Sequence, residues 1–386
     1  MTLTTSQLAQ IRDWRRTLHA QPEFGLDLPT TARFVAELLK SFGLDVHEGI
    51  GACGVVGVLR HGSARRIGLR ADMDALQIQE ANDVVHASRR PGFMHACGHD
   101  GHTAMLLGAA QTLATLENLD AVVHFIFQPA EEHGIGARRM IEDGLFDRFD
   151  IEEIYALHNL PGLKVGTLAT RAGPIMASED NFTITLDGTG GHAARPHLCN
   201  DLIVAGSELV LALQTIVARR VDPVTPAVVS VTEFITDGTR NALPSCCVVR
   251  GDTRSYEPEV QRIIETEMRR IADGVASVHG LHANVTYTHE FVATCNHVAA
   301  TERAARAGSA VAGATVIVNC DPLMMSDDFG VMLREKPGNY AFLGNGEHRT
   351  AGAEPLHSSR YDFNDAALPF GVQYFVELAR QGASDR

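Results

Sequence analysis

The chain has 386 residues, of which 45% are hydrophobic and 21% are charged, and its formal net charge is -14. This length exceeds what one ordinary hydrophobic core supports, so we expect two domains. The composition is typical of a globular protein. The acidic charge argues against a nucleic-acid groove and against an anionic membrane surface as partners. The seven cysteines have irregular spacings that do not suggest a disulfide framework. The sequence shows neither a signal pattern nor an apolar run of about 18 residues, so we expect a cytoplasmic protein.

The first part of the chain alternates helical and strand-like segments. Apolar spacing predicts helices over residues 5–20, 30–42, 103–115 and 134–143, and strands over residues 54–59, 66–70, 121–128 and 154–158. Strands that alternate with helices predict an α/β domain whose sheet is mostly parallel and covered by helices on both faces. Such folds bind ligands at the carboxyl ends of their strands.

The pattern of the sequence then changes from that of an α/β domain. The change begins after Gly173-Pro174. We predict strands near 182–187, 227–235, 246–254 and 284–291, and helices near 201–219 and 258–278. The order strand-helix-strand-strand-helix-strand is that of a ferredoxin-like α+β domain, which we place at residues 177–293. A helix over 297–311 and apolar turns around 340–343 then return to the first domain. Residues 1–176 and 294–386 are therefore expected to form one domain around the insertion.

The segment from Met94 to His102 is the most informative one, because it contains one thiol, three imidazoles and one carboxylate. Glu131, Glu132 and His158 follow at the ends of two later apolar runs. Thiolate, imidazole and carboxylate are the groups that bind borderline divalent metals. We interpret Cys97 and His99 as metal ligands, and the chain as a metal-dependent enzyme. His95 and His102 fit roles in packing or in orienting the ligands.

Two acidic pairs adjoin these segments. Glu131 and Glu132 are adjacent, so one carboxylate can bind metal while the other takes the proton of an attacking water. A solvated acidic loop is the alternative for this pair. Asp72 and Asp74 end a predicted strand, where an aspartate can orient an imidazole ligand, although an Asp-rich turn is also compatible.

Three further histidines are less informative on their own. His133 follows the acidic pair, with no basis for a choice between a supporting and an exposed position. His357 lies far along the chain in Pro355–Ser358, and His192 lies in a glycine-rich turn of the inserted domain. Without context, His192 fits a loop histidine as well as a catalytic one.

Several motifs together resemble a known family, and they run in order along nearly the whole chain. They are Arg15–His19 with Pro22-Glu23, Arg70–Leu76, Met94–His102, Gln128–Glu132, Leu157–Asn159, Gly190–Ala193, Asn241–Pro244 and Tyr361–Asp365. The chain resembles the dinuclear metallo-amidohydrolases related to aminoacylase and zinc carboxypeptidases. It is most similar to the branch that contains hippurate hydrolases, N-acyl-amino-acid amidohydrolases and indole-acetyl-amino-acid hydrolases.

The resemblance implies roles for specific residues. The implied ligands of two divalent ions, which could be Zn, Mn, Co or Ni, are Cys97, His99, Glu132, His158 and His357. It implies that Glu131 is the general base and that Asp74 supports the metal site. It also implies that the inserted domain is a lid and dimerisation domain whose His192 reaches the oxyanion, often in the partner subunit of a homodimer. Asn241 and Arg254 would bind the carboxylate end of the substrate.

The sequence departs from the family pattern at three positions. Gln77 and His133 stand where the family usually has Pro and Gly, and Asp327 stands where it usually has Glu. These differences concern substrate preference more than catalysis. Our hypothesis is a hydrolase that cuts N-acyl-amino acids into a carboxylic acid and an amino acid. The alternatives are a dipeptidase or carboxypeptidase and a catalytically inactive relative that binds such conjugates; the presence of Glu131 argues against the last.

Overall fold

The computed structural model describes residues 3–63 and 65–381. The chain divides into two compact units. Unit 1 comprises Met1–Ile175, Cys295–Pro322 and Asp327–Arg386, and unit 2 comprises Met176–Thr294 and Leu323–Ser326. The short segment Leu323–Ser326 therefore belongs with the inserted part of the chain, although the sequence patterns place it in the first domain.

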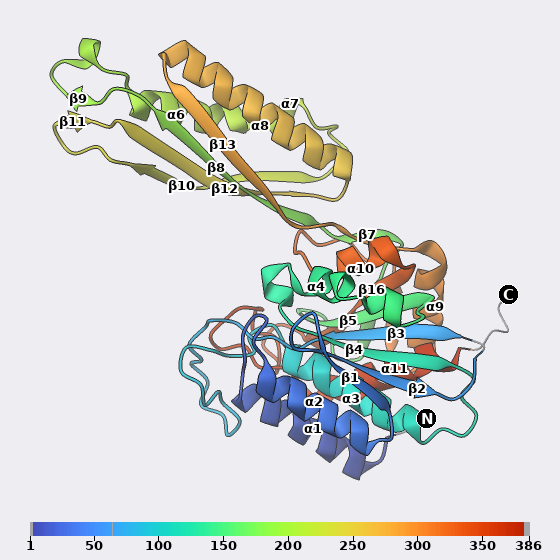
Figure 1. The fold of residues 1–386 in the computed structure, drawn as a ribbon. Coiled ribbons are helices and arrows are strands. Elements are labelled where there is room, and N and C mark those ends of the chain that lie inside the picture. The colour runs from blue at the N-terminus through green and yellow to red at the C-terminus, as the bar shows by residue number, and fades with distance from the viewer. Residues whose placement is uncertain (1–2, 64, 382–386) are drawn as a thin grey trace. The chain divides into compact units, whose positions relative to one another are not determined.

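Unit 1 is built on an eight-stranded sheet in the order β1-β2-β4-β3-β5-β16-β6-β15 (Figure 1). The strands are β1 (Asp45–Ile50), β2 (Gly54–Arg60), β3 (Arg66–Asp72), β4 (Val122–Gln128), β5 (Glu153–Pro161), β6 (Thr167–Thr170), β15 (Thr315–Val318) and β16 (Gly338–Gly346). The central pairs β4-β3, β3-β5 and β5-β16 are parallel, as is β6-β15. The pairs β1-β2, β2-β4 and β16-β6 are antiparallel. The expected α/β fold is confirmed, and the sheet is mixed outside its parallel centre.

Helices cover both faces of this sheet (Figure 1). One large core joins the sheet to α1 (Thr5–Ala20), α2 (Pro29–Ser41), α3 (His99–Ala114), α9 (Val298–Ala310) and α11 (Leu368–Arg380). The other face carries α4 (Gly136–Glu142) and α10 (Phe329–Glu335), and α5 (Leu145–Arg148) packs against α4. Helix α3 starts four residues earlier than the sequence pattern predicts. His99 and His102 therefore lie in its first turn, and nearly the whole helix is buried.

Strand β16 corrects one expectation from the sequence. We expected apolar turns around residues 340–343, but Gly338–Gly346 is a strand in which all nine residues are buried. A strand that is covered on both faces lacks the alternation of polar and apolar residues that identifies strands in a sequence. The strands β1, β6 and β15 were also not predicted, because none of them alternates between buried and exposed residues: all four residues of β6 are buried, and most residues of β1 and β15 are exposed or partly exposed.

Unit 2 has a four-stranded antiparallel sheet in the order β10-β12-β8-β13. Its elements in chain order are β8 (Ser178–Asp187), α6 (Leu202–Leu213), α7 (Thr215–Arg219), β10 (Ala227–Thr236), β12 (Cys246–Ser255), α8 (Pro258–His279) and β13 (His282–Phe291). This is the predicted strand-helix-strand-strand-helix-strand order. Alternate residues of β8 and β12 pack with α6 and α8 in a core of their own. None of the helices in the described part of the chain is long and apolar enough to span a membrane.

Candidate metal centre

The thiol and imidazole predicted as ligands meet where a loop turns into α3. Cys97 and His99 flank Gly98, whose backbone has a φ of 95°. This left-handed conformation suits glycine. The turn at Gly98 lets the side chains of Cys97 and His99, which lie on either side of it, enter the same group of candidate ligands. Cys97, His99 and His158 of β5 form a buried group whose candidate ligand atoms all lie within 4.8 Å of one another.

The acidic pair is placed by a sharp turn at the end of β4. Ala130 has a φ of 52°, and the 3-10 turn Glu131–His133 follows it. The backbone N–H groups of Glu131 and Glu132 donate to Oδ1 and Oδ2 of Asp74 at 3.0 and 3.2 Å. Asp74 therefore holds the backbone of the turn, and the two glutamate side chains stay available to the site. Glu131, Glu132 and His99 form a second group of candidate ligands.

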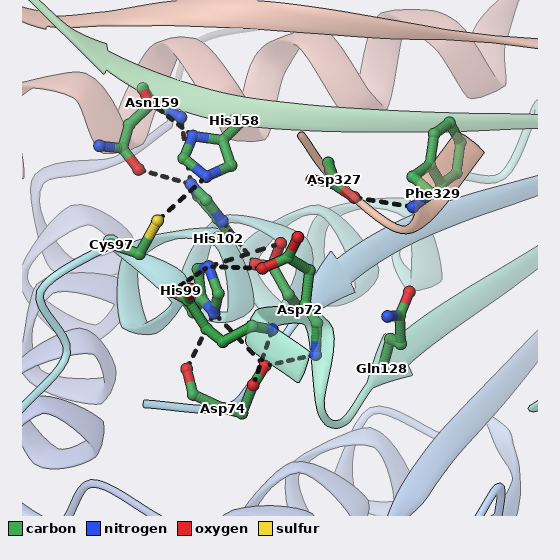
Figure 2. Close-up of polar contacts among 12 residues, drawn as sticks. Asp72, Asp74, Cys97, His99, His102, Gln128, His158, Asn159, Asp327 and Phe329 are labelled. Atoms are coloured by element: carbon green, nitrogen blue, oxygen red, sulfur yellow. Dashed lines mark hydrogen bonds and ion pairs between the residues drawn. The ribbon is translucent and has the colours of Figure 1, made fainter. Parts of the chain in front are cut away.

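Both buried imidazoles are oriented by backbone carbonyls (Figure 2). Nδ1 of His99 lies 2.8 Å from the carbonyl oxygen of Asp74, and Nδ1 of His158 lies 2.7 Å from that of Asn159. Since a carbonyl only accepts, each Nδ1 carries the proton in the neutral ring and each Nε2 has a free lone pair. Nε2 of His158 lies 3.5 Å from Sγ of Cys97. Both rings are therefore in the tautomer that can bind a metal through Nε2.

Two buried polar atoms of these groups have no hydrogen-bond partner among the residues that the structure describes. These atoms are Nε2 of His99 and Oε1 of Glu132, which lie 3.8 Å apart. A buried lone pair without a partner is costly, so such atoms call for a ligand. The donor set and these two atoms therefore fit a divalent cation.

His357 completes the set from the C-terminal part of the chain. Its backbone has a φ of 63°, and its N–H donates to the carbonyl oxygen of Ala96 at 2.8 Å. Nε2 of His357 lies 3.5 Å from Oε2 of Glu132, and its side chain is 52% exposed. Cys97, Glu132 and His357 form a third group of candidate ligands. The structure thus brings together all five residues whose ligand role was inferred by resemblance.

An excess of buried carboxylates surrounds these groups. Glu131 lies within 4.8 Å of Asp327 and Asp328, which precede α10. The only guanidinium that the described residues place among them is that of Arg70, which contacts Asp72, Asp327 and Asp328 at 2.7, 3.2 and 3.3 Å. Divalent cations would offset the remaining negative charge.

The proton affinities reflect this excess charge. Burial, together with Asp327 and Glu132, raises the pKa of Glu131 well above its usual range. Although burial lowers the pKa of His99, neighbouring carboxylates, Asp72 first among them, raise it to about 10. Burial and the same carboxylates also raise the pKa of the Cys97 thiol well above its usual range. Without cations the centre therefore retains protons that bound metal would displace.

Sequence reasoning gave His102 and Asp72 supporting roles, but it missed the residues that join them in the surrounding network. His102 contacts Asp72 through Nδ1 and Asn159 through Nε2, and the Asn159 amide donates to the hydroxyl of Tyr361 at 2.6 Å. On the far side of α3, the buried Asp100 contacts His19 and Arg15 at 2.8 and 3.5 Å. All of these residues lie in the quoted motifs, but only contacts in the folded chain show that they support the site.

Gly98 offers a direct test of the backbone geometry. A Cβ at this position would lie 2.3 Å from Oδ1 of Asn159 and 2.6 Å from the hydroxyl of Tyr361. Gly98→Ala should therefore lower the free energy of unfolding by about 2 kcal/mol or more, because it adds a clash to a left-handed backbone. It should also reduce the metal bound per chain. Denaturant unfolding and elemental analysis would measure both effects.

Gly274→Ala is the matched control, since a Cβ at Gly274 in α8 would meet nothing within 4 Å. It should leave metal content unchanged and preserve or slightly increase stability. Equal stability and metal content in both variants would contradict the clash.

The predicted residues of the inserted segment all lie in unit 2. His192 in β9 (Gly191–His192) pairs with Ala242 in β11 (Ala242–Leu243), and the N–H of Ala193 donates to the carbonyl oxygen of Asn241 at 3.0 Å. His192 and Asn241 are therefore neighbours, and both are exposed. The N–H of Ala194 donates to Nδ1 of His192 at 3.0 Å, which leaves the proton of the neutral ring on Nε2.

Arg254 lies at the opposite end of this unit. It is the ninth residue of β12, whose first residue follows the β11 turn, so it lies about 26 Å from that turn at the usual rise of a strand. Its guanidinium contacts Glu179 at 2.7 Å, Asp252, and Oγ of Ser326 at 2.8 Å. One unit therefore cannot bring Asn241 and Arg254 to the same substrate carboxylate.

Comparisons with known proteins agree with these features. The model of peptidase family M20/M25/M40 matches residues 68–381. The hippurate hydrolase of Campylobacter jejuni is 39% identical over 95% of this chain and 94% of its own. Thermostable carboxypeptidase 2 of Saccharolobus solfataricus is 35% identical over 97% of this chain and 96% of its own. Among solved structures, the YXEP protein of Bacillus subtilis, a dinuclear metal binding peptidase from the M20 family, has a TM-score of 0.84 and 30% identity, with 97% of this chain and 98% of that chain covered. The resemblance seen in the sequence is confirmed, and the chain belongs to peptidase family M20/M25/M40.

Proposed function

We propose that this protein is a metal-dependent amidohydrolase that cleaves N-acyl-amino acids into a carboxylic acid and a free amino acid. The observation that carries the proposal is the group of one thiol, three imidazoles and one carboxylate, exposed only at His357, that lies beside the buried carboxyl group of Glu131. The relatives support both the chemistry and the substrate class, since one is named a hippurate hydrolase and hippurate is an N-acyl-amino acid.

The proposed ligands are Cys97, His99, Glu132, His158 and His357. Their three overlapping groups are more than a single ion needs, and the B. subtilis relative is a dinuclear metal binding protein. Two divalent ions would polarise the acyl carbonyl and increase the acidity of water. The donor set suits Zn, Mn, Co or Ni.

Glu131 is the proposed general base. Its Oε2 lies 3.9 Å from Nε2 of His99, so the carboxylate borders the proposed ligands. Glu131 would take a proton from the attacking water and return it to the leaving amine. Burial and the neighbouring carboxylates give it a high affinity for that proton. Asp74 keeps this carboxylate in place through the backbone of the turn.

We further propose a homodimer in which unit 2 is the lid and dimerisation domain. Helix α6 exposes Val204 and Leu211, and Phe234 and Ile235 are exposed on β10 at one edge of the sheet. An exposed edge strand beside an apolar helix face is suited to pairing with a second copy. A dimer would also let Asn241 of one chain and Arg254 of the other hold one substrate. Arg254 would then exchange its contacts with Glu179 and Asp252 for the substrate carboxylate.

The thiols support a reducing compartment. All seven cysteines are free in the structure. The proposed role of Cys97 requires a reduced sulfur. We therefore propose that the protein works in the cytoplasm.

Metal removal tests the proposed function. A chelator should abolish hydrolysis of N-benzoylglycine, and Mn, Zn, Co or Ni should restore it, because the polarising charge is lost and regained. Release of glycine and metal content would be measured in parallel. Full activity in a preparation shown to be metal-free would contradict the proposal.

A matched dipeptide separates the peptidase alternative, which the S. solfataricus carboxypeptidase illustrates. Phenylalanylglycine has an aromatic group and a free amine in place of the plain acyl chain. An amidohydrolase should prefer N-benzoylglycine, whereas a dipeptidase should prefer the dipeptide. An inactive relative would cleave neither one after metal is added.

A further inference from the structure

We propose that a cluster of three aromatic side chains in unit 1, formed by Phe24, Phe93 and His133, binds the acyl group of the substrate and favours aromatic acyl groups. This inference rests on the proposed function. It gives His133, which departs from the family pattern, a specific role.

The cluster is attached to the same backbone that holds the metal centre. Ala75 follows Asp74 directly, and its N–H donates to the carbonyl oxygen of Glu23 at 2.7 Å, next to Phe24. Leu76 exchanges two backbone hydrogen bonds of 3.0 and 3.1 Å with Met94, next to Phe93. His133 follows Glu132 in the same 3-10 turn. Each of the three rings is therefore one residue away from a segment that is fixed to Asp74 or to a proposed ligand.

The segment that carries Phe24 is held firmly on its other side. The carboxylate of Glu23 accepts the N–H groups of Thr30 and Thr31 at 3.2 and 2.7 Å. These are donors at the start of α2, where Leu28 offers no side-chain cap. These hydrogen bonds fix the backbone next to Phe24. A surface that selects its ligand by shape needs such a fixed backbone.

The three rings present an aromatic surface that is only partly covered. The centroids of Phe24 and His133 lie 4.5 Å apart with an interplanar angle of 71°. Those of Phe24 and Phe93 lie 5.8 Å apart at 57°. Both phenylalanines are half-buried and His133 is exposed. Such edge-to-face arrangements leave ring faces and edges free for another aromatic group.

Two neighbours limit how the surface can be used. The guanidinium of Arg90 lies 4.3 Å from the centroid of Phe93, so a cation already covers that ring. A Cβ at Gly25 would lie 3.4 Å from Cε1 of His133, so the glycine leaves the imidazole room to lie against Phe24. Phe24 and His133 therefore offer the open part of the surface. A benzoyl or indole-acetyl group can lie against both rings, whereas an acetyl group is too small to do so.

Two substrates that differ only in the acyl group test this inference. The ratio of kcat/KM for N-benzoylglycine to that for N-acetylglycine should fall about fivefold to tenfold in Phe24→Leu, the loss expected for one aromatic pair. His133→Leu should lower the same ratio by a smaller factor. Phe42→Leu is the matched control, because Phe42 is a half-buried phenylalanine that packs against the core of unit 1. The centroid of its ring lies 5.7 Å from that of Trp14. This substitution should leave the ratio unchanged.

The outcomes separate this inference from the proposed function. An unchanged ratio in both Phe24→Leu and His133→Leu would overturn the aromatic site while leaving the amidohydrolase intact. If the unmodified enzyme hydrolysed neither substrate, the proposed function would fail. Calorimetric binding of N-benzoylglycine and N-acetylglycine to the metal-loaded protein would then decide the inference. Equal affinity of the unmodified protein for both compounds would overturn it.

Discussion

Glu131→Gln should lower kcat for N-benzoylglycine by about 100- to 10,000-fold, the usual contribution of a general base, while the metal bound per chain stays unchanged. The amide keeps the size of the side chain but cannot take a proton from water. The backbone N–H of Glu131 still donates to Asp74, so the turn should keep its shape. Steady-state kinetics and elemental analysis of the same preparation would measure the two quantities.

Glu132→Gln is the matched comparison, since the same change is made one residue along the same turn. Oε1 of Glu132 has no hydrogen-bond partner in the described part of the chain, and Oε2 lies 3.5 Å from Nε2 of His357. A ligand is removed here, so metal retention should fall, and added metal should restore part of the activity. If both variants lost metal equally, the division of roles between the two carboxylates would be wrong.

Four of the five proposed ligands could be recognised in the sequence because each lies in or next to a short local pattern. Cys97 and His99 share one short motif, and the carboxyl ends of β4 and the middle of β5 bring Glu132 and His158 to them. The position of His357 had no such local signal. It depends on a left-handed backbone and on one hydrogen bond to Ala96, a residue far away in the sequence.

The buried charges around Arg70 could not be predicted in the same way. Asp327 and Asp328 look like an ordinary acidic pair in the sequence, and exposed acidic pairs are common. They face Arg70 and Glu131 only because β16 and α10 bury them beside β3 and β4. Acidic residues in a sequence therefore indicate a functional site only when they are known to be buried. At these two positions burial results from tertiary packing, which the local sequence does not show.

Left-handed backbone recurs at the turns that position the proposed ligands. Gly98, Ala130 and His357 all have positive φ values. Gly98 lies between two proposed ligands, Ala130 precedes the turn that carries Glu132, and His357 is itself a proposed ligand. Only the first is glycine, so the other two store conformational strain of about 1–3 kcal/mol each, which the surrounding packing must offset. Such strain is expected in a site that holds its ligands in position before metal binds, because the fixed geometry is kept at the expense of local stability.

His192→Ala should cause the second large loss of kcat, and the tautomer of His192 explains why. The N–H of Ala194 occupies Nδ1, so Nε2–H of the neutral ring can donate to a developing oxyanion. Loss of one such donor typically costs about 100- to 1000-fold in kcat, and we expect His192→Ala to lose that much. Metal content should not change, because His192 belongs to unit 2 and the proposed ligands all belong to unit 1. A fall in metal content would contradict this assignment.

Mixing two inactive variants shows which chain supplies His192. In a homodimer with sites completed by the partner subunit, a His192→Ala chain retains Glu131, and a Glu131→Gln chain retains His192. After free exchange of an equal mixture, half of the dimers are hybrids and each has one intact composite site, so about a quarter of the wild-type activity should return. A mixture of His192→Ala with a His192→Ala, Glu131→Gln double variant is the control and should stay inactive. If differently tagged chains exchange but no activity returns, His192 acts within its own chain or not at all. The proposed dimer would then need another explanation for the separation of Asn241 and Arg254.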